Sequence, residues 1–183
     1  MEQVVTAGNI LLSDPFLKDP NFVRTAILVC EHDDKGSFGF VINKPSDYSL
    51  GSLVPSVDFS NFPVFIGGPV QNDTLHFIHS IPKEIGGFEI EDGVFWGGNF
   101  EMVITMLQQQ TLQYHQIKFF MGYSGWGSNQ LHTEVLEKSW IVTKGNQQLV
   151  LATPPDLIWK NALRKMDGEY SLMINYPLDP QLN

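Results

Sequence analysis

Two glycine-rich segments carry the residue types best suited to holding a ligand through backbone groups. The first is residues 67–69, Gly-Gly-Pro, and the second is residues 122–127, Gly-Tyr-Ser-Gly-Trp-Gly. Each segment follows a predicted strand, so free backbone N–H groups there can face a carboxylate or a phosphate. Neither segment matches a Walker loop or a dinucleotide-binding fingerprint. The simpler interpretation is that these glycines form tight turns and allow close packing, which is their commoner role.

The second segment also has part of the pattern of a nucleophile elbow, with Ser124 between a predicted strand and a predicted helix. An elbow needs a glycine two residues after the serine, where this chain has Trp126. It also needs an acid followed by a histidine further along the chain, and the last histidine is His132, only eight residues on. We therefore do not expect a serine hydrolase of this type.

The histidines and the single cysteine do not form a set of metal ligands. Cys30 and His32 lie two residues apart on a predicted strand, where they can act as nucleophile and base or as two ligands. Cys30, however, ends an apolar run, which is typical of a small buried hydrophobe. His76 and His79 are three residues apart, which on a strand places them on opposite faces. Since no set of three ligands is visible, we predict neither a metal site nor a bound cofactor.

Polar side chains of a predicted helix can add to the glycine-rich segments. Gln130 and Glu134 share one helical face, since they are four residues apart. The plainer interpretation of this pair is a solvated helix surface. Trp126 lies between glycines and can line a pocket, whereas Trp140 and Trp159 are predicted to belong to the core.

Composition limits the classes of function. The chain has 183 residues, of which 43% are hydrophobic, and a formal net charge of −9. This fits one domain with a sizeable core and disfavours a broad phosphate-binding surface. The densest basic cluster is Lys160, Arg164 and Lys165, which is too small for a nucleic-acid footprint. With one cysteine, an acidic N-terminus and no long apolar stretch, we expect a cytoplasmic protein that binds neither membranes nor nucleic acid directly.

The pattern of apolar residues predicts a single α+β domain over residues 1–183, with residues 169–183 as an irregular C-terminal tail. Asn99 is a predicted N-cap for the first of three helices. The short strands and the three helices follow no strict alternation, which argues against a doubly wound parallel sheet. The strands are predicted near residues 9–12, 24–32, 37–42, 63–66, 74–80, 88–90, 94–96, 116–121, 140–143 and 148–152, and the helices near residues 100–107, 129–138 and 154–167.

Sequence blocks from about Gly8 to Gly168 resemble the YqgE/AlgH family. The blocks are, in chain order, Glu31-His32, Gly36, Gly39-Phe-Val-Ile-Asn43-Lys-Pro45, Gly67-Gly68-Pro69-Val70, the Gly-Tyr-Ser-Gly-Trp-Gly run at 122–127, Gln130-Leu131, Glu134, Ser139-Trp140 and Leu157-Ile-Trp159. The chain departs from the family at Ser128-Asn129, where a Pro-Gly or similar pair is usual, and at His132, where an acid is usual.

The resemblance implies a bacterial cytosolic protein with one α+β domain. Its strongly bent mixed β-sheet would approach a small barrel, surrounded by about three helices. One member of the family is labelled a transcriptional regulator of alginate synthesis, but the resemblance brings no reaction with it. Because the charge disfavours direct DNA binding, we expect any regulatory effect to act through a protein or a small ligand.

Our leading hypothesis is a non-catalytic cytosolic binding or regulatory module with a glycine-rich pocket and an unknown small ligand or protein partner. Trp126 would stack on the ligand, and polar side chains would fix its orientation. The predicted ligand-binding residues are His32, Asn43, Gly67, Gly68, Pro69, Gly122, Tyr123, Gly125, Trp126, Gln130 and Glu134. The alternatives are a hydrolase-like enzyme with His32 or Glu134 as general base, and a transcriptional regulator.

Overall fold

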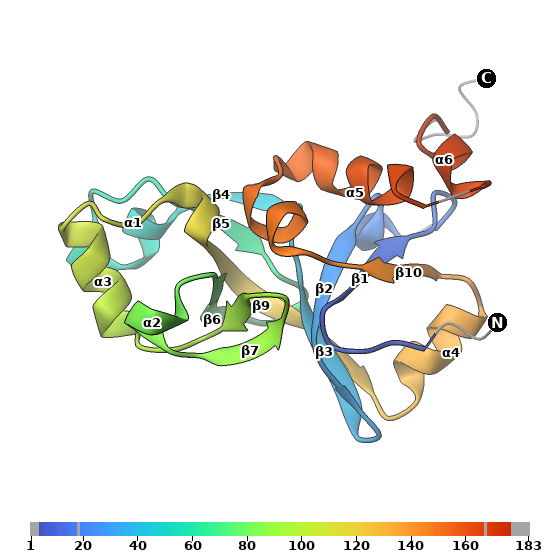
Figure 1. The fold of residues 1–183 in the computed structure, drawn as a ribbon, viewed down its shortest axis with the longest axis horizontal. Helices are drawn as coiled ribbons and strands as arrows, with labels where there is room; N and C mark the ends of the chain where they lie inside the picture. Colours follow the sequence, from blue (N-terminus) through green and yellow to red (C-terminus); the bar gives the residue numbers. More distant parts are fainter. Residues whose placement is uncertain (1–3, 18, 167, 177–183) are drawn as a thin grey trace.

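The computed structural model describes residues 4–17, 19–166 and 168–176. One mixed sheet of ten strands curls into part of a barrel (Figure 1). Its strands are β1 (Asn9–Ser13), β2 (Ala26–Asp33), β3 (Gly36–Val41), β4 (Pro45–Ser49), β5 (Pro63–Ile66), β6 (Val70–His79), β7 (Phe88–Glu91), β8 (Val94–Trp96), β9 (Ile117–Gly127) and β10 (Trp140–Lys144). The order is β10-β1-β2-β3-β9-β6-β8-β7, with β5 pairing both β9 and β4. Of the pairings in the described ranges, β5–β9 alone is parallel.

Short helices surround the sheet. They are α1 (Leu50–Leu53), α2 (Pro82–Ile85), α3 (Phe100–Gln108), α4 (Gln130–Leu136), α5 (Pro155–Arg164), α6 (Tyr170–Met173), the 3-10 turns η1 (Pro20–Phe22), η2 (Pro55–Val57) and η3 (Tyr114–Gln116), and the π-turn η4 (Gln148–Ala152). The longest three, α3, α4 and α5, are the three predicted helices, and the others are single turns. None of the helices in the described ranges is long and apolar enough to cross a membrane.

Strand β9 is the axis of the fold. Its first half pairs with β5 and β6, and its second half pairs with β3. Phe119 and Phe120 follow one another on this strand and point to opposite faces, so each lies in a different apolar cluster. The Phe120 cluster is covered by α5 and η4, and the Phe119 cluster by α3. A third cluster, with Trp126 and Trp140, packs under α4.

The prediction that β9 ends before a loop at residues 122–127 is wrong. These residues continue the strand, since Gly127 pairs with Gly36 and Ser124 pairs with Gly39. Gly122 has a φ of +67°, a conformation that bends the strand where it changes partners. Glycine-rich sequence is typical of loops, but here it allows a long strand to cross its neighbours closely.

Two further local predictions differ from the structure. Residues 148–152 form η4 and not a strand, because a short apolar run fits either element and the Asn146 side chain accepts a hydrogen bond from the backbone N–H of Leu149 at 2.8 Å. Helix α6 lies within the predicted irregular tail, of which residues 177–183 are outside the described ranges. The predicted cap of α3 is confirmed, since the Asn99 side chain accepts from the N–H of Met102 at 3.1 Å. The α+β class and the bent mixed sheet are also confirmed.

Candidate functional site

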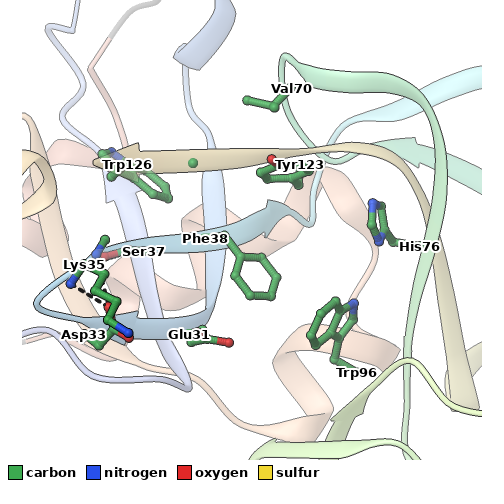
Figure 2. Close-up of a pocket in the computed structure, with 12 residues that line it drawn as sticks. Glu31, Asp33, Lys35, Ser37, Phe38, Val70, His76, Trp96, Tyr123 and Trp126 are labelled. Carbon is green, nitrogen blue, oxygen red and sulfur yellow. Dashed lines mark hydrogen bonds between the residues drawn. The ribbon is translucent and has the colours of Figure 1, made fainter. Parts of the chain in front are cut away.

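An open cleft of about 730 Å³ lies between the β2–β3 hairpin and strands β6, β8 and β9 (Figure 2). This volume falls within the range of about 300–1,000 Å³ that is usual for small-molecule sites. The lining residues are Glu31, Asp33, Lys35, Gly36, Ser37, Phe38, Val70, His76, Trp96, Tyr123, Gly125 and Trp126.

Four rings form one wall of the cleft. The centroids of Phe38 and Trp96 are 4.8 Å apart with the ring planes at 62°, and those of Phe38 and Tyr123 are 6.2 Å apart at 81°. His76 meets Tyr123 edge-on, at 6.0 Å and 84°. All four rings are half-buried, so part of each surface faces the cleft (Figure 2). Edge-to-face packing of this kind fixes each ring through its neighbours.

The sheet order explains why these rings meet. Phe38, Tyr123, His76 and Trp96 belong to β3, β9, β6 and β8, which are consecutive in the sheet. Strand pairing places Phe38 opposite Gly125 and His76 opposite Phe120. An aromatic row therefore crosses four adjacent strands, held by their backbone hydrogen bonds.

The β2–β3 hairpin supplies the charged side of the cleft. Its register shifts between Val29 and Glu31, so Cys30 is the extra residue of a bulge. Cys30 is buried in the core, and burial raises the pKa of its thiol well above the usual range. The next residue, Glu31, is exposed and lines the cleft. The bulge thus separates Cys30 from His32, which is exposed, and the two do not form a catalytic pair.

The charged groups of the hairpin differ in how far they are neutralised. Asp33 accepts hydrogen bonds through Oδ1 from the backbone N–H groups of Lys35 at 2.8 Å and Gly36 at 3.1 Å, which closes the turn. The Glu31 carboxylate and the Lys35 ammonium make no hydrogen bond or ion pair with any described residue. Both charged groups are therefore available to a ligand.

His76 is the titratable ring of the aromatic wall. Burial lowers its pKa below 6.5, so the ring is neutral at pH 7. Its Nε2 lies 3.1 Å from the hydroxyl oxygen of Thr74. A neutral imidazole adds aromatic surface to the wall without adding positive charge.

Glu134, a predicted general base, has a structural role. Its Oε2 accepts hydrogen bonds from the indole N–H groups of Trp126 at 2.9 Å and Trp140 at 2.7 Å. Its Oε1 accepts from the side-chain amide of Gln130 at 3.0 Å, and the Gln130 oxygen accepts from the N–H of Gly127 at 3.0 Å. With both carboxylate oxygens engaged, Glu134 joins α4 to β9 and β10 and does not point a free base at a ligand.

The two glycine-rich segments do meet in space, as the leading hypothesis required. The Gly67 N–H donates to the Met121 carbonyl at 2.9 Å, and the Ser124 hydroxyl donates to the Gly67 carbonyl at 3.1 Å. A Cβ on Gly68 would lie 2.2 Å from the carbonyl of Tyr123. Backbone therefore packs directly on backbone, and these glycines allow the close approach of two chain segments.

Of the predicted ligand-binding residues, Tyr123, Gly125 and Trp126 line the large cleft. The residues that do not line it are His32, Asn43, Gly67, Gly68, Pro69, Gly122, Gln130 and Glu134.

Two of these residues have roles elsewhere. His32 lines a neighbouring cleft of about 340 Å³ that shares Asp33, Gly36 and Ser37 with the large one. Asn43 accepts from the N–H of Ala26 at 2.9 Å and donates to the carbonyl of Arg24 at 2.8 Å, at the start of β2.

Sequence reasoning missed most of the wall. Phe38, His76 and Trp96 were not predicted to be site residues, and neither were Glu31 and Lys35. Glu31 lies within a family block, which is a weak signal for its position. No group of three or more His, Cys, Asp or Glu side chains in the described ranges can hold a metal ion.

Comparison with known proteins places the chain in a family. A model described as AlgH-like, DUF179, matches residues 10–171. A UPF0301 protein of Cytophaga hutchinsonii is 40% identical over 182 residues, which cover 98% of this chain and 100% of the relative. One of Chlorobium limicola is 38% identical over 177 residues, covering 96% of this chain and 95% of the relative.

Two solved structures share the fold. A crystal structure from Corynebacterium diphtheriae superposes with a TM-score of 0.78 at 18% identity, over 96% of this chain and 95% of the other. The solution structure of the AlgH protein from Pseudomonas aeruginosa superposes with a TM-score of 0.73 at 22% identity, over 97% of this chain and 98% of the other. By sequence, the chain belongs to the AlgH-like family, DUF179.

Proposed function

We propose that this protein is a non-catalytic binding module whose cleft takes a small organic ligand. The observation that carries the proposal is the aromatic row of Phe38, Tyr123, His76 and Trp96 along a cleft of about 730 Å³. Covering solvent-exposed apolar ring surface with a ligand favours binding by roughly 25 cal/mol per Å² of surface removed from water.

The wall is organised before a ligand arrives. Its rings come from four paired strands and contact one another, so little side-chain freedom remains to be lost on binding. The unpaired Glu31 and Lys35 groups at the hairpin supply the few polar contacts that orient a ligand in such sites. These features support the binding of an organic compound with an apolar or flat part.

We place the protein in the cytoplasm, with any regulatory effect exerted through the bound ligand or a protein partner. Direct binding to DNA does not fit a chain with 20 acidic and 11 basic residues.

A thermal-shift screen of a metabolite library tests the proposal. A ligand at 100 times its dissociation constant adds about 2.7 kcal/mol, which raises the melting temperature of a domain this size by roughly 5–10 °C. We expect the shift to be lost in Tyr123→Leu and kept in Tyr114→Leu, whose tyrosine is 60% exposed and does not line the cleft. A shift that survives Tyr123→Leu unchanged, or no shift with any compound, would contradict a small-molecule site here.

A second candidate function is a hydrolase-like enzyme with His32 as general base. The observation that favours it is a distance of 2.6 Å between His32 Nδ1 and the hydroxyl oxygen of Ser37, which face each other across β2 and β3. A nucleophile and a base need a third group that orients the base, and His32 Nε2 has no described hydrogen-bond partner. Labelling with a fluorophosphonate separates the functions: a hydrolase gives an adduct on Ser37 that Ser37→Ala abolishes, whereas a binding module gives none.

A further inference from the structure

We propose that the ligand of the cleft is a small organic cation, held by its ammonium or guanidinium group against the aromatic wall and Glu31. This inference rests on the proposed function and names the class of its ligand. It follows from the inclination of the ring planes, from a Glu31 carboxylate that no described residue pairs, and from the net negative charge of the side chains that line the cleft.

The ring planes of the wall are inclined to one another. Phe38 and Trp96 meet at 62°, and Phe38 and Tyr123 at 81°, so their planes do not lie parallel. A cation resting in the angle between such rings contacts more than one π-face, which is the arrangement that recognises quaternary ammonium groups. A planar ligand that binds by stacking alone needs only the face of one ring and does not require several inclined rings.

A carboxylate without a partner stands beside these rings. Figure 2 shows Glu31 below Phe38, with its carboxylate turned toward the side of the cleft where Trp96 lies. No described residue neutralises it. A cation over the wall therefore gains a Coulomb attraction in addition to its contact with the rings, and it displaces no existing ion pair.

The other charged groups lining the cleft leave the balance negative. Glu31 and Asp33 carry negative charge, Lys35 carries positive charge, and His76 is neutral because burial lowers its pKa. The whole chain has a formal net charge of −9, which attracts cations toward the surface over a longer range. An anionic ligand would meet two carboxylates and one ammonium group in the lining of the cleft.

A pair of isosteres tests the charge directly. Choline and 3,3-dimethylbutan-1-ol differ in one atom and in charge, and both are titrated into the full-length protein while the indole Nε1–H signals are followed by NMR. We expect saturable shifts of the Trp96 signal with choline, and binding of the neutral alcohol that is at least about fivefold weaker. Inorganic phosphate, the anionic probe, should leave the signal unchanged.

Two charge substitutions of opposite sign complete the test. Glu31→Gln should weaken choline binding by about three- to tenfold, and Lys35→Gln should strengthen it by about two- to fivefold. Glu101→Gln removes the same charge from α3, away from the cleft lining, and should leave the affinity within about twofold of wild type.

The outcomes separate the two proposals. Equal binding of the alcohol and choline, or phosphate binding that Lys35→Gln abolishes, overturns the inference about charge while the cleft remains a ligand site. Failure of choline at tens of millimolar, with neutral library compounds still shifting Trp96, also overturns it. If no compound of any charge shifts Trp96, the proposed function fails as well.

Discussion

Lys118 is a buried lysine of the sheet, and none of the described residues pairs a carboxylate with its ammonium group. It is on β9, is only 6% exposed, and its ammonium donates one hydrogen bond to the Ile42 carbonyl at 3.0 Å. The ammonium nitrogen also lies 4.6 Å from the centre of the Phe65 ring. Burial of the ammonium lowers the pKa of Lys118 from 10.5 to about 7. We predict that Lys118→Met stabilises the protein at neutral pH.

The magnitude follows from proton linkage. Each pKa unit corresponds to about 1.4 kcal/mol, so keeping Lys118 buried at pH 7 costs about 4 kcal/mol relative to an unfolded chain. Methionine fills similar space but loses the hydrogen bond to Ile42 and the contact of the charge with Phe65, together about 1–2 kcal/mol. The expected net gain for Lys118→Met is therefore about 2–3 kcal/mol.

The sign of the pH dependence gives a second readout. Between about pH 7 and 10.5 the unfolded chain binds more protons at Lys118 than the folded protein, so wild-type stability rises with pH in that window. From pH 7 to pH 9 the advantage of Lys118→Met should shrink by about 2 kcal/mol.

Urea denaturation at pH 7, 8 and 9 measures both effects. Lys83→Met, at an exposed position on α2, is the matched control and should stay within about 0.5 kcal/mol of wild type. Destabilisation by Lys118→Met to the same extent at all three pH values would refute the reasoning, since it would mean that the charge is already compensated in the folded protein.

Three further predictions concern groups that hold the fold around the cleft. Glu134→Ala leaves two indole N–H groups without their acceptor and should lower the unfolding free energy by about 2–4 kcal/mol in urea titrations. Glu137→Ala, at the exposed C-cap of α4, should lower it by less than about 0.5 kcal/mol. Equal losses in the two variants would contradict the structural role of Glu134. Gly68→Ala puts a Cβ 2.2 Å from the carbonyl of the facing strand and should cost about 3 kcal/mol or more. Gly86→Ala, at a backbone conformation that also favours glycine (φ +77°, ψ −140°) but with nothing within 4 Å of the added Cβ, should cost less, and equal melting temperatures for the two variants would show that the strand contact adds no cost. Burial lowers the pKa of His79 in the folded protein, so the unfolded chain takes up a proton at this residue at a higher pH than the folded protein does. The contribution of the neutral ring to stability is therefore present above about pH 6.5 and is lost as the pH falls. A histidine NMR titration should find the ring neutral at pH 6.5, and a titration midpoint above 6.5 would be inconsistent with this.

Local sequence patterns predicted the elements whose signal is local. The apolar run of β2 and the Asn99 cap of α3 depend on neighbouring residues, and both predictions are confirmed. The second half of β9 was missed because glycines at 122, 125 and 127 are typical of loops, and only pairing with β3 makes them a strand. Pairing partners far apart in the chain are not encoded in a local pattern.

The candidate site shows the same limit. Tyr123, Gly125 and Trp126 were predicted because one conspicuous motif contains them. Phe38 and Trp96 belong to ordinary strand patterns, and their meeting depends on the order β3-β9-β6-β8, which joins segments from four parts of the chain. Glu134 was predicted for its chemistry, yet its partners are two indoles that the fold alone brings to it.

The indole N–H signals provide the most direct measurement of the central claim, which is that the aromatic cleft binds a ligand. In the described structure Trp126 and Trp140 donate to Glu134, and Trp159 donates to the Ser13 carbonyl at 3.1 Å, whereas the Trp96 N–H has no protein acceptor. Titration of ¹⁵N-labelled protein with the strongest compound from the thermal-shift screen should move the Trp96 signal saturably and leave the Trp140 and Trp159 signals in place. A Trp96 signal that stays fixed while the protein is saturated with that compound would contradict the claim.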